Sequence, residues 1–213
     1  MNFDEFLVSL SKIKNIPLPA EASQFKMSPP FRNELINSYK EAMKNAKRAG
    51  VLAMFYPNAT NETYLALILR KTYRGVHSAQ IGFPGGKYED EDKTLKHTAI
   101  RETWEEIGVP KHQIKVIKQM TEVYIPPSNF YVQPFIGIAQ NTPKFIKQDE
   151  EVEDIVEVSL AHFLDENNVC NKLVATSYTA KIEVPAYELN GHVVWGATAM
   201  MLSEIKDIIK AIL

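Results

Sequence analysis

Apolar residues are spaced three or four apart in several parts of the chain, as on one face of a helix. In residues 2–13 this spacing predicts an amphipathic helix. After a stretch rich in proline, residues 31–48 are expected to form a second helix, ended by Gly50. Residues 198–213 have the same periodicity and are expected to form the last helix.

Shorter apolar segments bounded by turn residues indicate strands. Residues 51–56 and 64–69 are expected to be paired strands joined by a loop. Asn190-Gly191 is a strong turn dipeptide, and it predicts a hairpin between residues 180–189 and 192–195. Further strands are expected at 114–124, 131–139 and 155–158, with a short helix at 160–166.

The predicted strands and helices are mixed without a regular alternation. This order favours an α/β or α+β fold with a mixed sheet. The length of 213 residues suits a single domain, with residues 1–49 as a helical N-terminal extension and residues 50–213 as the core. Because 45% of the residues are apolar, the chain can form a full hydrophobic core.

Charge and cysteine content narrow the partners and the compartment. A net charge of -2 gives no basic field that would attract nucleic acid, so we expect no nucleic-acid partner. No apolar run approaches the ~18 residues of a membrane helix, so no membrane partner is expected. Cys170 is the single cysteine, which favours a reducing, cytoplasmic location. A homodimer is a fair expectation because such dimers are common.

The strongest chemical signal lies in residues 94–107, which are expected to form one helix closed by Gly108. Positions three and four apart on a helix share a face, so Glu102 should lie beside Glu105 and Glu106. Three carboxylates within about one turn repel one another, and in the middle of a helix the dipole does not offset that repulsion. A cation is therefore expected over them.

Oxygen ligands without histidine or cysteine favour Mg²⁺ or Mn²⁺ over zinc. Such an ion suits phosphoryl chemistry, because it bridges phosphate oxygens and lowers the pKa of a bound water. Gly85 and Gly86, ahead of the helix, let the backbone approach a phosphate closely. Arg101 precedes Glu105 by four residues, so it is expected to orient that carboxylate or to contact a phosphate.

The competing interpretation is a solvated acidic face, which many surface helices carry. By itself the cluster of glutamates favours that interpretation. The residues on the opposite side of the same helix, such as Ala99 and Ile107, form a face to be buried. The double glycine and the closing Gly108-Val109 also fall at fixed offsets, and these offsets favour a functional site.

Residues 86–109 resemble the Nudix box. That motif has a glycine, five residues, an acid, about seven residues, Arg-Glu, two residues, Glu-Glu, one residue, a glycine and an apolar residue. Here the first acid is Asp92 instead of glutamate, and eight residues separate it from Arg101, one more than usual. Thr103 also occupies a position that is usually aliphatic. One Nudix branch is similar in the first two respects.

This resemblance implies a Nudix fold, an α/β/α sandwich with a mixed sheet. It also implies that Glu102, Glu105 and Glu106 are ligands of Mg²⁺ or Mn²⁺. Glu105 and Arg101 are then candidate catalytic residues. The implied reaction is hydrolysis of a nucleoside diphosphate linked to another moiety.

The segment ahead of the box resembles, in part, that of the coenzyme A diphosphatase branch. Arg70 and the run Phe83-Pro84-Gly85-Gly86 match directly. Gly75 and Ala79 stand where this branch has an arginine and a glycine. Residues 194–199 are also similar to this branch, and the whole resemblance extends from about residue 51 to residue 202.

The resemblance implies cleavage of coenzyme A, or acyl-CoA, to adenosine 3′,5′-bisphosphate and phosphopantetheine or its acyl form. Coenzyme A carries a pyrophosphate and a separate 3′-phosphate, so cations are expected near the site. Arg70 and Arg74 are candidates for phosphate contacts, together with Gly85 and Gly86. His77 is a candidate base, phosphate donor or loop hydrogen-bond partner, and we favour the last.

A general base is also needed unless a glutamate of the box serves as one. The acidic run at residues 149–154 is the expected source, and Glu151 is favoured because it precedes an apolar residue at the start of a strand. Residues 126–130 are expected to form a loop on the substrate side, where Phe130 or Tyr131 can stack on adenine.

Two other functions stay open. The first is a Nudix hydrolase of another nucleotide, such as ADP-ribose, an ADP-sugar or a dinucleoside polyphosphate. The second is a Nudix module that senses a nucleotide without cutting it. The intact set of Arg101, Glu102, Glu105 and Glu106 argues against the second, because such modules can lose these residues.

Overall fold

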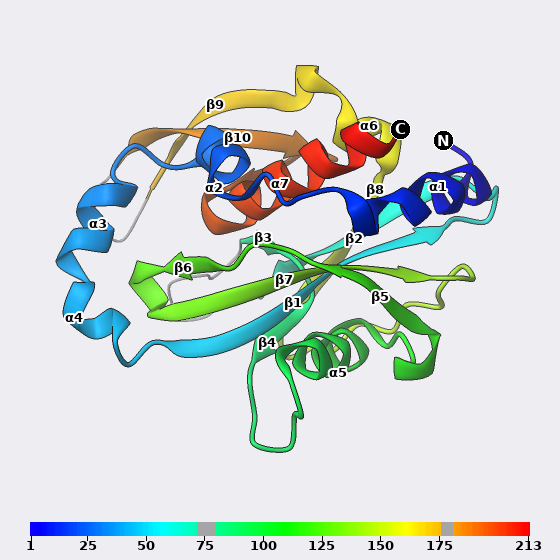
Figure 1. Cartoon of the computed structure of the whole chain (residues 1–213), viewed down its shortest axis with the longest axis horizontal. Coiled ribbons are helices and arrows are strands. Elements are labelled where there is room, and N and C mark those ends of the chain that lie inside the picture. The colour runs from blue at the N-terminus through cyan, green and yellow to red at the C-terminus, as the bar shows by residue number, and fades with distance from the viewer. Residues whose placement is uncertain (72–79, 176–180) are drawn as a thin grey trace.

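A mixed sheet forms the middle layer of the protein in the computed structural model, which describes residues 1–71, 80–175 and 181–213 (Figure 1). The main strand order is β3-β2-β1-β7-β5. The central strand β1 (Lys47–Pro57) pairs antiparallel with β2 (Thr63–Arg70) and parallel with β7 (Phe130–Ala139). The other strands of this sheet are β3 (Ile81–Gly82), β4 (Gly85–Lys87), β5 (Ile114–Gln119), β6 (Val123–Ile125) and β8 (Val152–Ser159).

Helices cover both faces of this sheet, as Figure 1 shows. One face is covered by α5 (Leu95–Ile107) and the other by α7 (Gly196–Ile212), with α1 (Phe3–Leu10) and α2 (Ala20–Gln24) beside it. A smaller sheet contains β9 (Val169–Val174), β10 (Ile182–Leu189) and β11 (His192–Trp195). The shorter helical segments are η1 (Ser11–Asn15), η2 (Phe25–Met27), α3 (Arg32–Ser38), α4 (Lys40–Met43), η3 (Lys111–Gln113), η4 (Pro126–Ser128), α6 (Leu160–Leu164) and η5 (Glu166–Asn168). The predicted α/β/α sandwich with a mixed sheet is confirmed.

Strand β1 contributes to two separate cores, because successive side chains of a strand point to opposite faces. One set of its residues packs in the core on the α7 side, and the other packs against α5: Ala49, Val51, Ala53 and Phe55 in the first, and Leu52, Met54 and Tyr56 in the second. Gly50 belongs to the α5 side, where an added Cβ would lie 2.2 Å from the carbonyl oxygen of Leu95. Helix α5 therefore packs directly on the backbone of β1.

The predicted helix over residues 31–48 is interrupted at Tyr39 and ends at Met43, so the prediction is wrong for its last residues. The helical part breaks into α3 and α4, and the chain is already in β1 at Lys47. Lys47 and Arg48 pair with Phe130 and Tyr131 of β7, so sheet pairing overrides the local helical pattern. The expected boundary after residue 49 consequently falls inside β1.

Most other predicted elements are present, with shifted ends. The hairpin at Asn190-Gly191 and the helix closed by Gly108 are confirmed. The strand expected at residues 114–124 is divided into β5 and β6. Strand β9, which contains Cys170, and helix α2 have no counterpart among the predicted elements, because both are too short to give a clear period.

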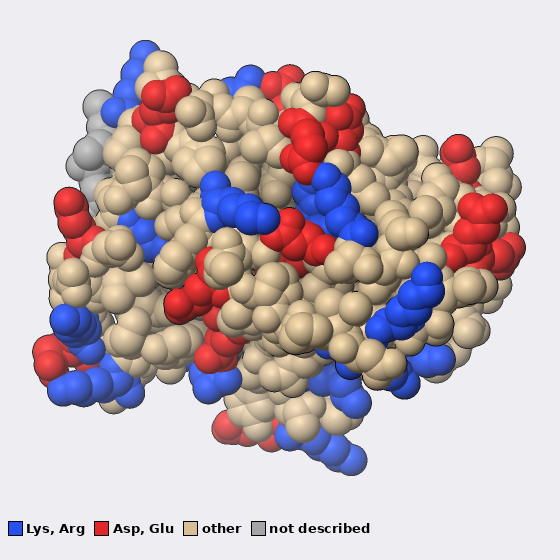
Figure 2. Space-filling view, turned by 45° about the horizontal axis from the view of Figure 1, so that its top comes forward, with Lys and Arg blue, Asp and Glu red and all other residues tan. Residues whose placement is uncertain are grey.

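Basic and acidic side chains are interspersed on the face that Figure 2 shows. They do not gather there into one large patch of a single sign. Within residues 1–71, 80–175 and 181–213, no helix is both long and apolar enough to cross a membrane.

Candidate active site

Helix α5 is fixed at both ends by local backbone geometry. Thr94 caps its start in an extended conformation, and Gly108 ends it with φ +75°, a value that favours glycine. The carbonyl oxygens of Glu106 and Ile107 accept hydrogen bonds from the backbone of Gln148 and Ile146. The end of the acidic helix is therefore attached to the segment that leads to Glu151.

Arg101 is the centre of a network of acceptors. Its Nη1 donates to Glu105 at 2.8 Å and to Glu102 at 3.0 Å, so the predicted contact between Arg101 and Glu105 is present. Its Nη2 donates to the Lys87 carbonyl at 3.0 Å and to Asp92 at 2.9 Å. All three nitrogens of the Arg101 guanidinium donate hydrogen bonds inside the protein. This arrangement favours a role for Arg101 in orienting the carboxylates over a direct contact with a substrate phosphate.

Asp92 is the partner that holds Arg101 in place. It is buried, and it accepts hydrogen bonds from Arg101 Nε at 3.1 Å and from Thr98 Oγ1 at 2.9 Å. Burial alone would raise the pKa of Asp92, but the hydrogen bonds from Arg101 and Thr98 together keep that pKa below its usual value. In the sequence Asp92 stands out only as the first acid of the motif. Helical spacing could not reveal the contact, because Asp92 precedes the helix.

Glu106 is the most deeply buried carboxylate of the box, with 2% of its surface exposed. It accepts a hydrogen bond from the Gly85 backbone N–H at 2.7 Å, and Arg70 Nη1 lies 3.7 Å from it. Burial raises the pKa of Glu106 to about 7, and the neighbouring Glu102 and Glu151 add to this rise. The site thus holds a carboxyl group that lacks a full counter-charge.

Glu102 lies against the second glycine of the motif. An added Cβ at Gly86 would come within 2.4 Å of the Glu102 carboxylate, so the close approach requires glycine. Burial raises the pKa of Glu102, Arg101 lowers it, and Glu105 and Glu151 raise it again. Glu105 is more exposed than the other two, with 42% of its side chain accessible.

The donor set fits a hard divalent cation. It offers only carboxylate oxygens, and burial raises the pKa of two of them, which a metal ion would offset. In the part of the chain that the structure describes, no three acidic, histidine or cysteine side chains are arranged to hold a metal as they stand. In this arrangement Arg101 engages Glu102 and Glu105, while Gly85 and Arg70 engage Glu106. Metal binding would require these carboxylates to exchange partners.

Glu151 lies next to this cluster. It directly precedes β8, as predicted, and its charge acts on both Glu102 and Glu106. Its backbone N–H donates to Gln148 Oε1 at 2.8 Å, and its carbonyl accepts from Lys71. The side chain is exposed, so water reaches it.

The cationic residues expected ahead of the box are only partly described. Arg70 ends β2 and donates to the Gly85 carbonyl at 3.0 Å, besides its contact with Glu106. Arg70 therefore connects the end of β2 to the glycines and to the buried carboxylate. Arg74 and His77 lie outside the described residues.

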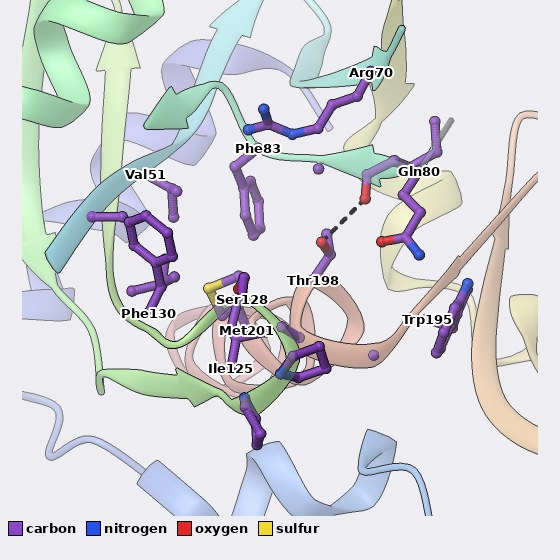
Figure 3. A pocket seen from close by; sticks show the side chains of 18 of the residues that line it. Val51, Arg70, Gln80, Phe83, Ile125, Ser128, Phe130, Trp195, Thr198 and Met201 are labelled. Carbon is purple, nitrogen blue, oxygen red and sulfur yellow. Dashed lines mark hydrogen bonds between the residues drawn. The ribbon is translucent and has the colours of Figure 1, made fainter. Parts of the chain in front are cut away.

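A cavity of about 380 Å³ opens beside Gly85 and Gly86, as Figure 3 shows. Phe83 and Phe130 point into it, and Thr198 closes one side through a hydrogen bond of 3.1 Å to the Ile81 carbonyl (Figure 3). The glutamates of the box do not line this cavity. They contact the two glycines that do line it, because Glu106 accepts a hydrogen bond from the Gly85 backbone and Glu102 lies against Gly86.

Two predictions about aromatic residues have different outcomes. Residues 126–128 and Phe130 line the cavity, as expected for a substrate-side loop, whereas Tyr131 packs against Tyr124 with ring centres 5.0 Å apart. Trp104, on the acidic helix, is 45% exposed, with Lys111 Nζ 4.6 Å from its ring centre.

Comparisons with known proteins agree with this site. Residues 46–175 match the family model described as NUDIX domain. A mitochondrial coenzyme A diphosphatase of Homo sapiens is 30% identical over 60% of this chain and 54% of its own length. A peroxisomal coenzyme A diphosphatase of Caenorhabditis elegans is 26% identical over 72% of this chain and 64% of its own length. The chain thus covers 54% of the length of the first relative and 64% of the length of the second.

One further sequence relative and one solved structure are also similar to this chain. A Nudix hydrolase of Yersinia pestis is 27% identical over 81% of this chain and 84% of its own length. A MutT/nudix family protein from Enterococcus faecalis has a similar fold, with a TM-score of 0.51 and 15% identity over 78% of this chain and 62% of that one. The family model covers more than half of the chain, and the residues of its characteristic motif meet in one site. The chain therefore belongs to the Nudix family.

Proposed function

We propose that the chain hydrolyses the pyrophosphate bond of coenzyme A or acyl-CoA to adenosine 3′,5′-bisphosphate and (acyl-)phosphopantetheine. The observation that carries the proposal is a pair of carboxylates, the partly buried Glu102 and the buried Glu106, held against Gly86 and Gly85 at the edge of a cavity. The similarity to two coenzyme A diphosphatases supports the choice of substrate.

Glu102, Glu105 and Glu106 would hold the metal ion, for which we propose Mg²⁺ or Mn²⁺. When bound, that ion would neutralise charge on the phosphate oxygens and lower the pKa of a water molecule. Arg101, held by Asp92, keeps the carboxylates in place. In this proposal the glutamates hold the metal ion, and Arg101 positions the glutamates.

The remaining residues bind substrate or accept a proton. Arg70, Gly85 and Gly86 line the cavity next to the carboxylates, where they are placed to contact the pyrophosphate. Arg74 and His77 are proposed as further binding residues on sequence grounds alone. Glu151 accepts the proton of the attacking water. The water oxygen bonds to one phosphorus, and the bond from that phosphorus to the bridging oxygen breaks.

The test is a substrate panel with Mg²⁺ or Mn²⁺ titrated over each substrate. It contains coenzyme A, acetyl-CoA, a long-chain acyl-CoA, ADP-ribose, an ADP-sugar and a dinucleoside polyphosphate, with the products identified by mass. We expect coenzyme A or an acyl ester to have the highest kcat/KM and to release adenosine 3′,5′-bisphosphate. A much faster turnover of an ADP-sugar would overturn the substrate and favour the alternative that Gly75 and Ala79 leave open.

The Glu105→Gln variant separates an enzyme from a nucleotide sensor. The change removes a negative charge and keeps the shape of the side chain, so the fold should persist. We expect turnover to fall by about two orders of magnitude, on the scale of losing part of a metal's charge stabilisation. Steady-state kinetics and the circular dichroism spectrum measure the two effects.

The matched control for this variant is Glu183→Gln, which alters an exposed carboxylate in β10, outside the box and outside the acidic run at residues 149–154. Its turnover should remain within about twofold of the wild type, as for surface changes in general. Unchanged turnover in Glu105→Gln would remove the metal-site assignment. The cytoplasmic location and the homodimer stay predictions, and light scattering tests the dimer.

A further inference from the structure

The charged residues that line the cavity are all basic. Arg32, Arg70 and Lys87 line it, and the described residues around it include no aspartate or glutamate. Arg70 is partly neutralised by Glu106, which lies 3.7 Å away. The two other cationic residues of the lining, Arg32 and Lys87, are candidates to bind an anionic ligand.

Arg32 is a cation with few partners. Its Nη2 donates to the Tyr124 carbonyl at 2.8 Å, and its Nε is buried without a hydrogen-bond partner. No carboxylate of the described residues forms an ion pair with it; Glu21 acts on it only at longer range. Burial lowers the pKa of Arg32, as expected for a charge that has lost water without gaining an anion. An anionic group in the cavity would supply the missing counter-charge.

Arg32 lies at the end of the cavity away from the box. Its partner Tyr124 is next to Ile125, and Figure 3 shows Ile125 and Arg70 on opposite sides of the cavity. The wall between these two ends is mainly apolar, with Phe83, Phe130 and Met201. A ligand that fits this lining has an anionic group at each end and a flat or apolar group between them.

We propose that Arg32 binds a second phosphate of the substrate, a phosphate monoester separate from the pyrophosphate that is cut. The proposal rests on the proposed function, in which the pyrophosphate lies at the Gly85–Gly86 end. The nucleotide's base and sugar then occupy the apolar middle of the cavity. Arg32 is a specificity residue from helix α3, and it favours substrates that carry a 3′-phosphate on the ribose.

The kinetic test compares coenzyme A with 3′-dephospho-coenzyme A, which differ only in that phosphate. In Arg32→Gln we expect the KM for coenzyme A to rise about tenfold or more, with kcat changed less than about threefold. The KM for the dephosphorylated substrate should change less than about threefold. Arg32→Lys, which keeps the charge, should recover part of the loss.

A binding test separates this proposal from the proposed function. Calorimetry without metal compares adenosine 3′,5′-bisphosphate with adenosine 5′-monophosphate. The wild type should bind the bisphosphate about tenfold or more tightly than the monophosphate, and Arg32→Gln should remove that preference. Arg48→Gln is the control, because Arg48 pairs with Glu122 and does not line the cavity.

The outcomes are distinct. Failure of the wild type to cut coenzyme A refutes the proposed function, while the binding comparison still tests Arg32. Equal losses for both substrates or both nucleotides in Arg32→Gln overturn the role of Arg32. So does a wild type without any preference for the bisphosphate, or an equal effect of Arg48→Gln.

Discussion

At the scale of single residues, the site depends on a few close contacts that only certain side chains permit. Asp92 and Thr98 fix Arg101 and its surroundings, and Gly86 leaves room for the Glu102 carboxylate. These contacts join residues whose spacing along the sequence matches neither the period of a helix nor that of a strand. The motif predicted which residues meet, because its spacing is fixed. It did not predict that Asp92 would be the anchor of Arg101.

Gly86→Ala should separate activity from stability. The new methyl group would displace the Glu102 carboxylate, which is the flexible end of a side chain, so we expect a small change in Tm and at least about a tenfold loss of kcat. Gly50→Ala is the contrasting variant. Its methyl group meets the Leu95 backbone, so the cost falls on the free energy of unfolding, by about 1–3 kcal/mol. Thermal melts and kinetics of both variants measure the contrast, and equal loss of stability in the two would contradict it.

At the scale of elements, helix α7 is tied to the N-terminal segments by the buried Glu204. Its carboxylate accepts hydrogen bonds from the Ala20 backbone, from Gln24 Nε2 and from the Thr121 backbone, each at 3.2 Å. It also accepts one from the Thr121 hydroxyl at 2.5 Å. One side chain thus joins α2 and the connection between β5 and β6 to α7.

Glu204→Ala should therefore destabilise the whole domain. It leaves four buried or partly buried hydrogen-bond donors without their acceptor, which we expect to cost about 3 kcal/mol in the free energy of unfolding. For a chain of this size that corresponds to a fall in Tm of about 6–12 °C, measurable by calorimetry. Glu34→Ala, at an exposed position in α3, should change the free energy of unfolding by less than about 0.5 kcal/mol. A similar loss in both variants would show that the buried contacts of Glu204 contribute little.

The elements also show how far the sequence could be interpreted. Helix α5 was predicted because its period, its closing Gly108 and its motif agree. Strand β4 was missed, since Gly85–Lys87 is too short for any period and forms only by pairing with β1. The start of β1 was misassigned because its parallel partner β7 lies more than seventy residues further along the chain. The role of Arg32 has no sequence signal, since it depends on a cavity made by distant segments.

At the scale of the whole molecule, the site should make stability depend on pH and on metal. Because the folded pKa of Glu106 is about 7, above its ordinary value, the folded protein binds more protons than the unfolded chain between those two values. This contribution is full below the ordinary pKa and is lost as the pH rises through about 7. The metal-free protein should therefore lose about 3 kcal/mol of unfolding free energy from this group.

Thermal melts with a chelator at pH 5 and pH 8 measure this loss. In Glu106→Gln the difference in Tm between the two pH values should be smaller than in the wild type. Adding Mg²⁺ at pH 8 should raise the Tm of the wild type and should have less effect on the variant. A wild type and variant with the same pH dependence would show that Glu106 is not the titrating group.

Because β1 contributes to two cores, its length should be more constrained in evolution than its composition. A substitution in β1 alters one core and leaves the other intact. An insertion or deletion of one residue would exchange the two sets of side chains between the cores and would move Gly50 away from Leu95. Related proteins should therefore vary in the composition of this strand but not in its length. Changes in length are expected instead in surface connections such as residues 58–62.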